Sequence, residues 1–357
     1  MKRVVFLVFF LVVAFTAMAQ FPAVTIPGSQ VRKIQSYIVN QEYELHVLLP
    51  ANYSEAKKYP VVYLMDSQWD FPLAKSIYGQ QYFDGFIPEL IIVGVTWGGA
   101  NPNADSLRAR DYIPTGNKKI LQGANQFLLF MKTELFPFIE KNYAADPNNR
   151  TLMGCSLGGL ITLYALFTHG EMFNGYIAAS PAIGWNNEAI YTFEKEYFEA
   201  ESRKPVRLYM TIGDVENNVP GFERLSDFLY KRNYQSLQLK TKVLENTGHS
   251  GTKSETYTRG LQYVFERPVI NISESALQKY VGKYGTTTGN MLEVKIESGK
   301  LVAYFSPTRK YFLKAASTSH FYSMAEFLNV IFEINNENIT GLTMERYGSS
   351  KWLAKIN

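Results

Sequence analysis

Apolar segments and amphipathic segments alternate along the first two thirds of the chain. Residues 43–49 carry apolar side chains at every second position, which predicts a half-buried strand, and residues 36–39 are expected to pair with it across a turn at Asn40 and Gln41. Strongly apolar segments predict further strands at residues 60–66, 90–95, 151–153, 176–179, 206–212 and 237–244. Helices are expected at residues 127–138, bent or ended near Pro137, and at residues 221–231 and 255–265. Strands that alternate with helices predict an α/β fold, in which helices cover both faces of a mostly parallel sheet.

The pattern changes near Pro268, where short strands replace this alternation. Residues 292–296 and 301–305 alternate apolar and polar side chains around a turn, and the segment from Asn335 to Asn338 has the composition of a second hairpin turn. Further short strands are expected at residues 311–313, 330–334, 341–344 and 352–356. We therefore predict an α/β domain at residues 20–268 and a small all-β domain at residues 269–357, for which a closed barrel would remove exposed strand edges.

The N-terminal segment has the features of a secretory signal peptide. Lys2 and Arg3 precede an apolar run at residues 4–15, and an Ala-x-Ala cleavage signal precedes Gln20. The apolar run is shorter than the ~20 residues that a membrane-spanning helix needs. We predict that residues 1–19 are removed, that the mature chain is secreted or periplasmic, and that it does not insert into a membrane.

Composition narrows the class of protein. The chain has 357 residues, of which 46% are hydrophobic and 19% are charged, and these fractions are typical of a globular protein. Without the signal peptide, the formal net charge falls from +4 to +2, which gives no basis for a nucleic-acid partner. Cys155 is the single cysteine, so no disulfide can form within the chain.

The segment Gly154-Cys155-Ser156-Leu157-Gly158 contains the strongest candidate for a catalytic residue. It lies between the apolar run at residues 151–153 and a second one at residues 160–166, which predicts a strand, a sharp turn and a helix with Ser156 at the apex. Glycines allow the tight turn because they have no Cβ atom to clash. The turn would present the serine hydroxyl to a base and a substrate, so Ser156 is the predicted nucleophile.

A serine hydroxyl needs a base that accepts its proton, and the chain contains four histidines. His46 falls in an N-terminal strand, His169 at the end of the helix after the elbow, and His320 in the all-β domain. His249 falls in a polar loop after the last strand of the α/β domain, where hydrolases with the chain order serine, acid, histidine carry the base. We predict that His249 is the base.

An acid that orients the histidine is expected after the preceding strand, where the sequence offers two carboxylates. Glu216 lies three residues past Gly213, the spacing at which such an acid commonly follows the strand, whereas Asp214 could instead cap the following turn. A serine–histidine dyad without an acid is the third alternative.

An oxyanion that forms in the reaction needs backbone donors. We expect the N–H of Leu157, at the start of a helix whose dipole helps, and the N–H of Gln68, in the loop after the strand that ends at Asp66. Arg110 could bind an acidic group of the substrate or form a structural ion pair with Asp111. Trp185 could form a wall of the site or pack in the core.

Six segments occur in the order that is typical of a known family. They are PVVYLMD (60–66), RDYIP (110–114), ELFPFIE (134–140), GCSLGG (154–159), SP (180–181) and GHS (248–250). Residues 31–267 thus resemble the esterase D and enterochelin-esterase-like family of α/β-hydrolases. The resemblance implies an α/β-hydrolase fold and ester hydrolysis with Ser156 as nucleophile, His249 as base and Glu216 as acid. We expect the chain to need no metal or other cofactor. Ser67 and Cys155 depart from the residues that are common in the family, glycine and histidine.

The C-terminal part resembles a second family. Residues 277–284, followed by Gly299-Lys300-Leu301, are similar to the lipocalin-like barrel appended to some penicillin-binding-protein-like serine hydrolases. The combined interpretation is a serine carboxylesterase that works through an acyl-enzyme. Its partner would be a small-molecule or carbohydrate-linked ester, either an acetyl or feruloyl ester of a polysaccharide or a siderophore lactone. The alternatives are an acyltransferase on the same scaffold and a non-catalytic homologue that binds a ligand.

Overall fold

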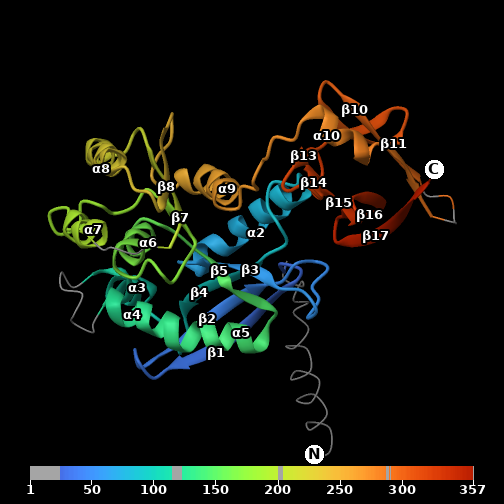
Figure 1. The fold of residues 1–357 in the computed structure, drawn as a ribbon. Helices are drawn as coiled ribbons and strands as arrows, with labels where there is room; N and C mark the ends of the chain where they lie inside the picture. The colour runs from blue at the N-terminus through green and yellow to red at the C-terminus, as the bar shows by residue number, and fades with distance from the viewer. Residues whose placement is uncertain (1–24, 115–122, 200–203, 287–288, 290, 357) are drawn as a thin grey trace, which may run out of the picture.

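A computed structural model describes residues 25–114, 123–199, 204–286, 289 and 291–356. The predicted signal peptide, residues 1–19, lies outside these ranges. The described residues form an α/β part and, beside it, an all-antiparallel β part (Figure 1). None of the helices within these ranges is both long and apolar enough to span a membrane.

The first sheet has eight strands in the described residues, in the order β1-β2-β4-β3-β5-β6-β7-β8. The strands are β1 (Ser29–Ser36), β2 (Gln41–Leu48), β3 (Tyr59–Leu64), β4 (Ile91–Trp97), β5 (Ala145–Cys155), β6 (Gly175–Ala179), β7 (Val206–Gly213) and β8 (Leu237–Leu244). Strands β1, β2 and β4 pair antiparallel, and the pairs from β4 through β3 to β8 are parallel. The predicted α/β fold with a mostly parallel sheet is confirmed.

The prediction of a strand at residues 36–39 is wrong. The strand β1 ends at Ser36, and residues 37–40 form the turn. The Ser36 hydroxyl accepts a hydrogen bond from the Val39 N–H at 3.0 Å, and Asn40 takes a left-handed conformation with φ 56°. A serine side chain that bonds to the backbone in this way favours a turn over strand pairing. The strand was predicted because Ile38 and Val39 are apolar.

Helices cover both faces of the sheet. They are α2 (Ser67–Phe83), α3 (Ala104–Tyr112), α4 (Ala124–Phe130), α5 (Phe136–Asn142), α6 (Leu157–Thr168), α7 (Ile190–Glu199), α8 (Val219–Arg232) and α9 (Thr252–Val264). Helices α2 and α9 pack on one face, around Phe71, Ile77 and Tyr257, and the other helices pack on the opposite face around residues such as Phe127 and Tyr164. Both faces are therefore buried, as expected for a parallel sheet.

The helix predicted at residues 127–138 runs from Ala124 to Asn142 and does not end near Pro137. Between α4 and α5 the chain forms one turn of π-helix, Met131–Leu135, and Pro137 lies at the start of α5. Proline has no N–H to donate and its ring crowds the preceding turn, and a π-turn is one way in which a helix accommodates this.

The second sheet is barrel-like. Its strands, in the order β12-β11-β10-β9-β17-β16-β15-β14-β13, are β9 (Gly282–Gly285), β10 (Met291–Glu297), β11 (Lys300–Ser306), β12 (Arg309–Phe312), β13 (Lys314–Ala315), β14 (His320–Ser323), β15 (Leu328–Asn335), β16 (Asn338–Arg346) and β17 (Ser349–Ile356). The two edge strands, β12 and β13, are separated in sequence by Leu313 alone, so the sheet curves back on itself and nearly closes. Apolar side chains such as Tyr284, Val330 and Leu342 fill its interior.

The two parts are in contact at the C-terminal ends of α2 and α9. The rings of Tyr82 and Phe327 have centroids 4.7 Å apart, and Phe83 stacks on Tyr347 at 5.0 Å. The Phe327 N–H donates to the Phe83 carbonyl at 3.1 Å. Figure 1 shows the barrel-like sheet beside these helix ends, on the side away from α6 and α7.

Candidate active site

The sequence-predicted residues lie at one edge of the first sheet. Ser156 follows β5, Glu216 follows β7 and His249 follows β8, and these three strands belong to the parallel part of the sheet. The carboxyl ends of parallel strands meet at the same edge, so residues more than 90 positions apart in the sequence can come together there. This edge is the candidate active site.

Ser156 has the backbone geometry of a nucleophile elbow. Its φ of 60° and ψ of −116° are rare for a residue with a side chain, and such strain is typical of functional positions. A Cβ atom on Gly154 would lie 2.6 Å from the carbonyl carbon of Gly158, so the turn requires glycine there. The Ser156 N–H donates to the Ala179 carbonyl at 3.0 Å, which fixes the elbow to strand β6.

Glu216 and His249 are in direct contact. Oε2 of Glu216 lies 2.6 Å from Nδ1 of His249, and Oε1 accepts hydrogen bonds from the Ser180 hydroxyl at 2.5 Å and the Gly213 N–H at 2.9 Å. Partial burial would raise the pKa of Glu216, but the hydrogen bonds from Ser180, His249 and Gly213 outweigh it and the pKa is lowered. A carboxylate held in the ionised form can keep the His249 proton on Nδ1 and leave Nε2 free to accept one.

Asp214 has a different set of partners. Its carboxylate accepts the N–H of Asn246 at 2.9 Å and of Thr247 at 3.0 Å, and these two bonds lower its pKa. Asn246 and Thr247 begin the loop that carries His249, so Asp214 shapes this loop and does not contact the imidazole. Of the two carboxylates that the sequence offers, the structure brings Glu216 to His249.

The Ser156 hydroxyl and His249 form no hydrogen bond in the described residues. They are linked indirectly through Thr252 and Ser180. The Thr252 hydroxyl donates to the His249 carbonyl at 2.8 Å and lies 2.9 Å from the Ser180 hydroxyl. Ser180 follows Ala179, whose carbonyl accepts the Ser156 N–H. Hydrogen bonds of catalytic groups are often long in the absence of substrate and tighten when it binds.

Both predicted oxyanion donors lie in the first turn of a helix. Leu157 is the first residue of α6, and Gln68 is the second residue of α2. First-turn N–H groups have no acceptor within their own helix, and the helix dipole favours negative charge near them. The amide oxygen and nitrogen of the Gln68 side chain are also buried, with no hydrogen-bond partner in the part of the chain that the structure describes.

The other histidines have different surroundings. Nδ1 of His46 lies 2.8 Å from the hydroxyl of the fully buried Ser67, and its Nε2 lies 3.2 Å from Glu44. A Cβ atom on Gly94 would overlap the Ser67 hydroxyl at 2.0 Å, so Ser67, one of the departures from the family, occupies the space beside Gly94. His320 lies in β14, in a strand as predicted.

Arg108, which the sequence analysis missed, lies beside the elbow. It forms a bidentate pair with Asp66 at 2.8 and 2.9 Å and donates to the Cys155 carbonyl at 3.1 Å. Burial raises the pKa of Asp66 to about 6 in spite of the opposing effect of Arg108. Arg108 therefore connects Cys155, the residue before the nucleophile, to Asp66, the residue before α2. The sequence analysis missed Arg108 because its partner Asp66 lies 42 positions away, and no local pattern indicates such a pair.

Arg110 forms the structural ion pair with Asp111 that the sequence analysis gave as one of its two roles. It forms a bidentate pair with Asp111 at 2.7 and 2.9 Å, and the buried Asp111 also accepts hydrogen bonds from Tyr43 and Trp97 at 2.7 Å. Trp185 is half-buried in the segment after β6, on the same edge as Ser156, and Trp69 in the first turn of α2 is 50% exposed. A role for Arg110 or Trp185 in substrate binding remains a prediction.

A buried ion pair connects the two helices that flank the site. Asp70 of α2 accepts hydrogen bonds from Lys253 of α9 at 2.6 Å and from the Tyr257 hydroxyl at 2.7 Å. Asp70 is 2% exposed. The contact holds the N-terminus of α2, with Gln68, close to the N-terminus of α9, which follows His249.

The sequence of residues 36–257 matches the family described as "Putative esterase". The matched segment contains Ser156, Glu216 and His249 and covers more than half of the chain. The chain belongs to this esterase family. Membership, together with relatives that are named esterases, identifies the chain as a carboxylic ester hydrolase and confirms the predicted resemblance.

Several relatives have been named for siderophores. The chain is 32% identical over 214 residues to ferri-bacillibactin esterase BesA of Bacillus subtilis, across 55% of this chain and 73% of that protein. It is 37% identical over 123 residues to the siderophore enterobactin esterase of Emericella nidulans, across 32% of this chain and 40% of that protein. The crystal structure of BES protein from Bacillus cereus is similar with a TM-score of 0.62 and 27% identity, covering 68% of this chain and 97% of that one.

Proposed function

We propose that this esterase cleaves its substrate through an acyl-enzyme on Ser156, with His249 as base, Glu216 as the orienting acid and the N–H groups of Leu157 and Gln68 as oxyanion donors. The observation that carries the proposal is the 2.6 Å contact between Glu216 and His249 at the sheet edge where Ser156 has its strained conformation. The family membership supports the same chemistry.

The first half-reaction forms the acyl-enzyme. The Ser156 oxygen attacks the ester carbonyl carbon while its proton passes to Nε2 of His249. The carbonyl oxygen becomes an oxyanion, which the N–H groups of Leu157 and Gln68 stabilise. The bond to the alcohol oxygen then breaks, and the leaving alcohol takes the proton from His249.

The second half-reaction releases the acid. Water attacks the acyl carbon and gives a proton to His249, and the Ser156 oxygen leaves and takes that proton back. Throughout, Glu216 accepts the hydrogen bond from Nδ1 and stabilises the imidazolium that forms twice in each cycle. The products are an alcohol and a carboxylic acid, and no cofactor takes part.

We propose that the substrate is a siderophore lactone. The support is the 32% identity to ferri-bacillibactin esterase across most of that protein, whereas the likeness to a ferulic acid esterase is 21% and speaks for the fold alone. Of the two substrate classes that the sequence analysis left open, this favours the lactone over polysaccharide esters.

The test measures kcat/KM for a tricatecholate trilactone siderophore, with and without iron, beside acetylated xylan and methyl ferulate. We expect the trilactone to be preferred by a factor of about 100, since recognition of several substrate groups together contributes several kcal/mol. The Ser156→Ala variant should lose on the order of 10⁶ in kcat on every substrate. A preference for acetylated xylan would overturn the substrate, and an active Ser156→Ala variant would overturn the mechanism.

We also propose that the protein is exported and loses its first 19 residues. The support is the basic pair, the apolar run and the cleavage signal before Gln20. The intact mass of the protein recovered from the medium or the periplasm should be that of a chain that begins at Gln20, with or without the loss of ammonia that turns an N-terminal glutamine into pyroglutamate. Recovery of a chain that still begins at Met1 would contradict the proposal.

A further inference from the structure

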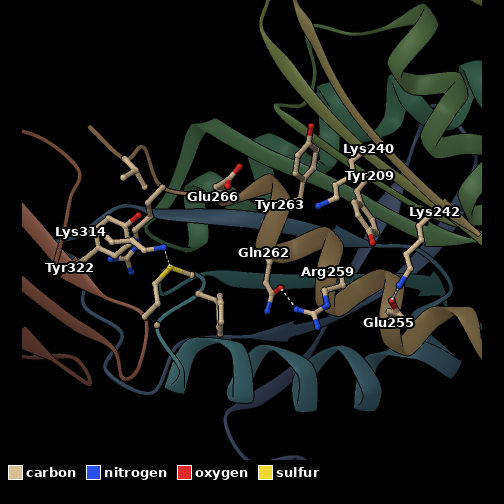
Figure 2. Close-up of a pocket in the computed structure, with 15 residues that line it drawn as sticks. Tyr209, Lys240, Lys242, Glu255, Arg259, Gln262, Tyr263, Glu266, Lys314 and Tyr322 are labelled. Carbon is tan, nitrogen blue, oxygen red and sulfur yellow. Dashed lines mark hydrogen bonds and ion pairs between the residues drawn. The ribbon is translucent and has the colours of Figure 1, made fainter. Parts of the chain in front are cut away.

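A cavity of about 400 Å³ lies where α9 and strands β7 and β8 meet the barrel-like sheet (Figure 2). Residues of β7, β8 and α9 form one side of the cavity. Lys314 of β13, Tyr322 of β14 and Met324, which follows β14, form the other side. None of the candidate catalytic residues lines it. The volume lies within the range of sites that hold small molecules.

Positive charge dominates the lining. Five of the side chains are cationic, Lys240, Lys242, Arg259, Arg267 and Lys314, and two are carboxylates, Glu255 and Glu266. Within the described ranges, Lys242 is the one cavity cation that has an ion pair, with Glu255 at 2.7 Å. Figure 2 shows Lys314 at one end of the cavity and Lys240 and Lys242 toward the other, so positive charge is present along its length.

Arg267 is the most unusual of these cations. Arg267 is half-buried, and its guanidinium donates a hydrogen bond at 2.7 Å to the neutral amide oxygen of Asn329. It lies 4.8 Å from the ring centroid of Tyr322 and 5.4 Å from that of Phe327. Burial lowers its pKa. A half-buried cation without a paired carboxylate is a group that an anionic ligand can neutralise.

Lys314 is exposed and has no carboxylate partner among the described residues. The contact of its ammonium group is with the thioether sulfur of Met324 at 3.2 Å, and a thioether is a weak acceptor. Arg259 donates to the neutral Gln262 at 2.9 Å. Both cations are exposed to solvent, so their remaining donors are accessible to an anionic ligand.

Aromatic rings line the same space. The rings of Tyr209 and Tyr263 have centroids 6.0 Å apart, and Tyr322 lies below Arg267 at the other end. Flat rings next to cationic groups suit a ligand that has both a ring and negative charge, because the ring can stack while the charge pairs.

We infer that this cavity is a second binding site, separate from the ester-cleaving site, for a small aromatic molecule that carries several negative charges. Arg267 and Lys314 pair with the anionic groups from the two sides of the junction. The ligand thereby bridges the α/β part and the barrel-like part, since Arg267 follows α9 and Lys314 belongs to β13. The inference does not depend on which ester the enzyme cleaves.

Calorimetric titration of the purified protein with trimesate, a benzene ring with three carboxylates, tests the inference. Tricarballylate, an aliphatic tricarboxylate, and neutral benzamide serve as comparison ligands. The test variants are Arg267→Gln and Lys314→Met, and Lys300→Met is the matched control, because Lys300 is an exposed lysine of the barrel-like sheet that does not line the cavity. Melting temperatures and the hydrolysis of a small aryl ester show that each variant is folded and active.

We expect trimesate to bind more tightly than tricarballylate and benzamide not to bind. Each test variant should weaken trimesate about tenfold or more, the cost of one charge-assisted contact, while Lys300→Met changes it less than about twofold. Lys314→Met keeps the test decisive if Arg267→Gln fails to fold. Absence of trimesate binding, equal binding of tricarballylate, or equal weakening by Lys300→Met would overturn the inference.

Discussion

Replacement of Glu216 by glutamine tests the role of the carboxylate through the position of a single proton. In the structure, Oε1 of Glu216 accepts two donors, the Gly213 N–H at 2.9 Å and the Ser180 hydroxyl at 2.5 Å. A glutamine in the same place keeps these two bonds only if its amide oxygen takes the position of Oε1. Its NH₂ group then takes the position of Oε2, 2.6 Å from Nδ1 of His249.

An NH₂ group that points at Nδ1 forces this nitrogen to act as acceptor, so the imidazole carries its proton on Nε2. In that tautomer Nε2 cannot take the proton of Ser156. An equivalent change of tautomer in a serine protease lowers kcat by about 10⁴, and we expect a loss of this order for Glu216→Gln, or about 5 kcal/mol of transition-state stabilisation. The shape and volume of the side chain are unchanged, so the fold should be retained.

Asp214→Asn is the matched control, because it makes the same chemical change two residues away. Asp214 bonds to two backbone N–H groups of the His249 loop, so this variant should disturb the loop and lower kcat by about tenfold at most. The assay is kcat on an aryl acetate, together with the rate of labelling of Ser156 by a fluorophosphonate. A large loss in Asp214→Asn with a small one in Glu216→Gln would refute the assignment, and small losses in both would favour a dyad.

Further predictions concern the contacts that hold the fold together. Asp70→Asn should lower the free energy of unfolding in urea by about 3 kcal/mol, because it leaves the Lys253 ammonium unpaired, and adding Lys253→Met should restore part of that loss; an additive double variant would contradict the reasoning. Burial would raise the pKa of Glu326, but hydrogen bonds from Tyr311 and Arg346 and the charge of Arg346 lower it to about 2. The stabilisation from Glu326 is therefore present above the ordinary carboxyl pKa of about 4.5 and is lost as the pH falls toward 2. Glu326→Gln should therefore cost about 1 kcal/mol at pH 7, after allowance for solvent exposure, and nothing near pH 2; a cost that does not change with pH would refute this. The fragment 20–267 should remain folded by circular dichroism and cleave a small aryl acetate at near the full rate, whereas a folded but inactive fragment would mean that the barrel-like part completes the site.

Local patterns were sufficient for the elbow and for most strands. Ser156 could be predicted because its turn, its glycines and the flanking apolar runs are contiguous in the sequence. The spacing from Gly213 favoured Glu216 over Asp214, but only the fold shows their distant partners. Glu216 contacts Ser180 and His249, whereas Asp214 accepts hydrogen bonds from the loop that carries His249.

Other features were missed for identifiable reasons. Helix α2 was not predicted, although Phe71, Ala74, Ile77 and Tyr78 recur at helical spacing, because Pro72 and the polar residues between them weaken the pattern. Arg108 was passed over in favour of Arg110, because a local motif contains Arg110 while the ion pair of Arg108 joins residues 42 positions apart. The cavity could not be predicted, because it lies between the α/β part and the barrel-like part and the apolar pattern of each part predicts only its own strands and helices.

The arrangement of α2 and α9 connects the barrel-like part to the chemistry. The N-terminus of α2 carries Gln68, the N-terminus of α9 follows His249, and the two helices are bound to each other through Asp70 and Lys253. Their C-terminal ends contact the barrel-like sheet, α2 through Tyr82 and Phe83, and α9 through Arg267, which follows it. The junction thus lies at the far ends of the helices that position Gln68 and follow His249, and it supplies no predicted catalytic residue, which is why the fragment 20–267 is expected to keep its activity on a small ester.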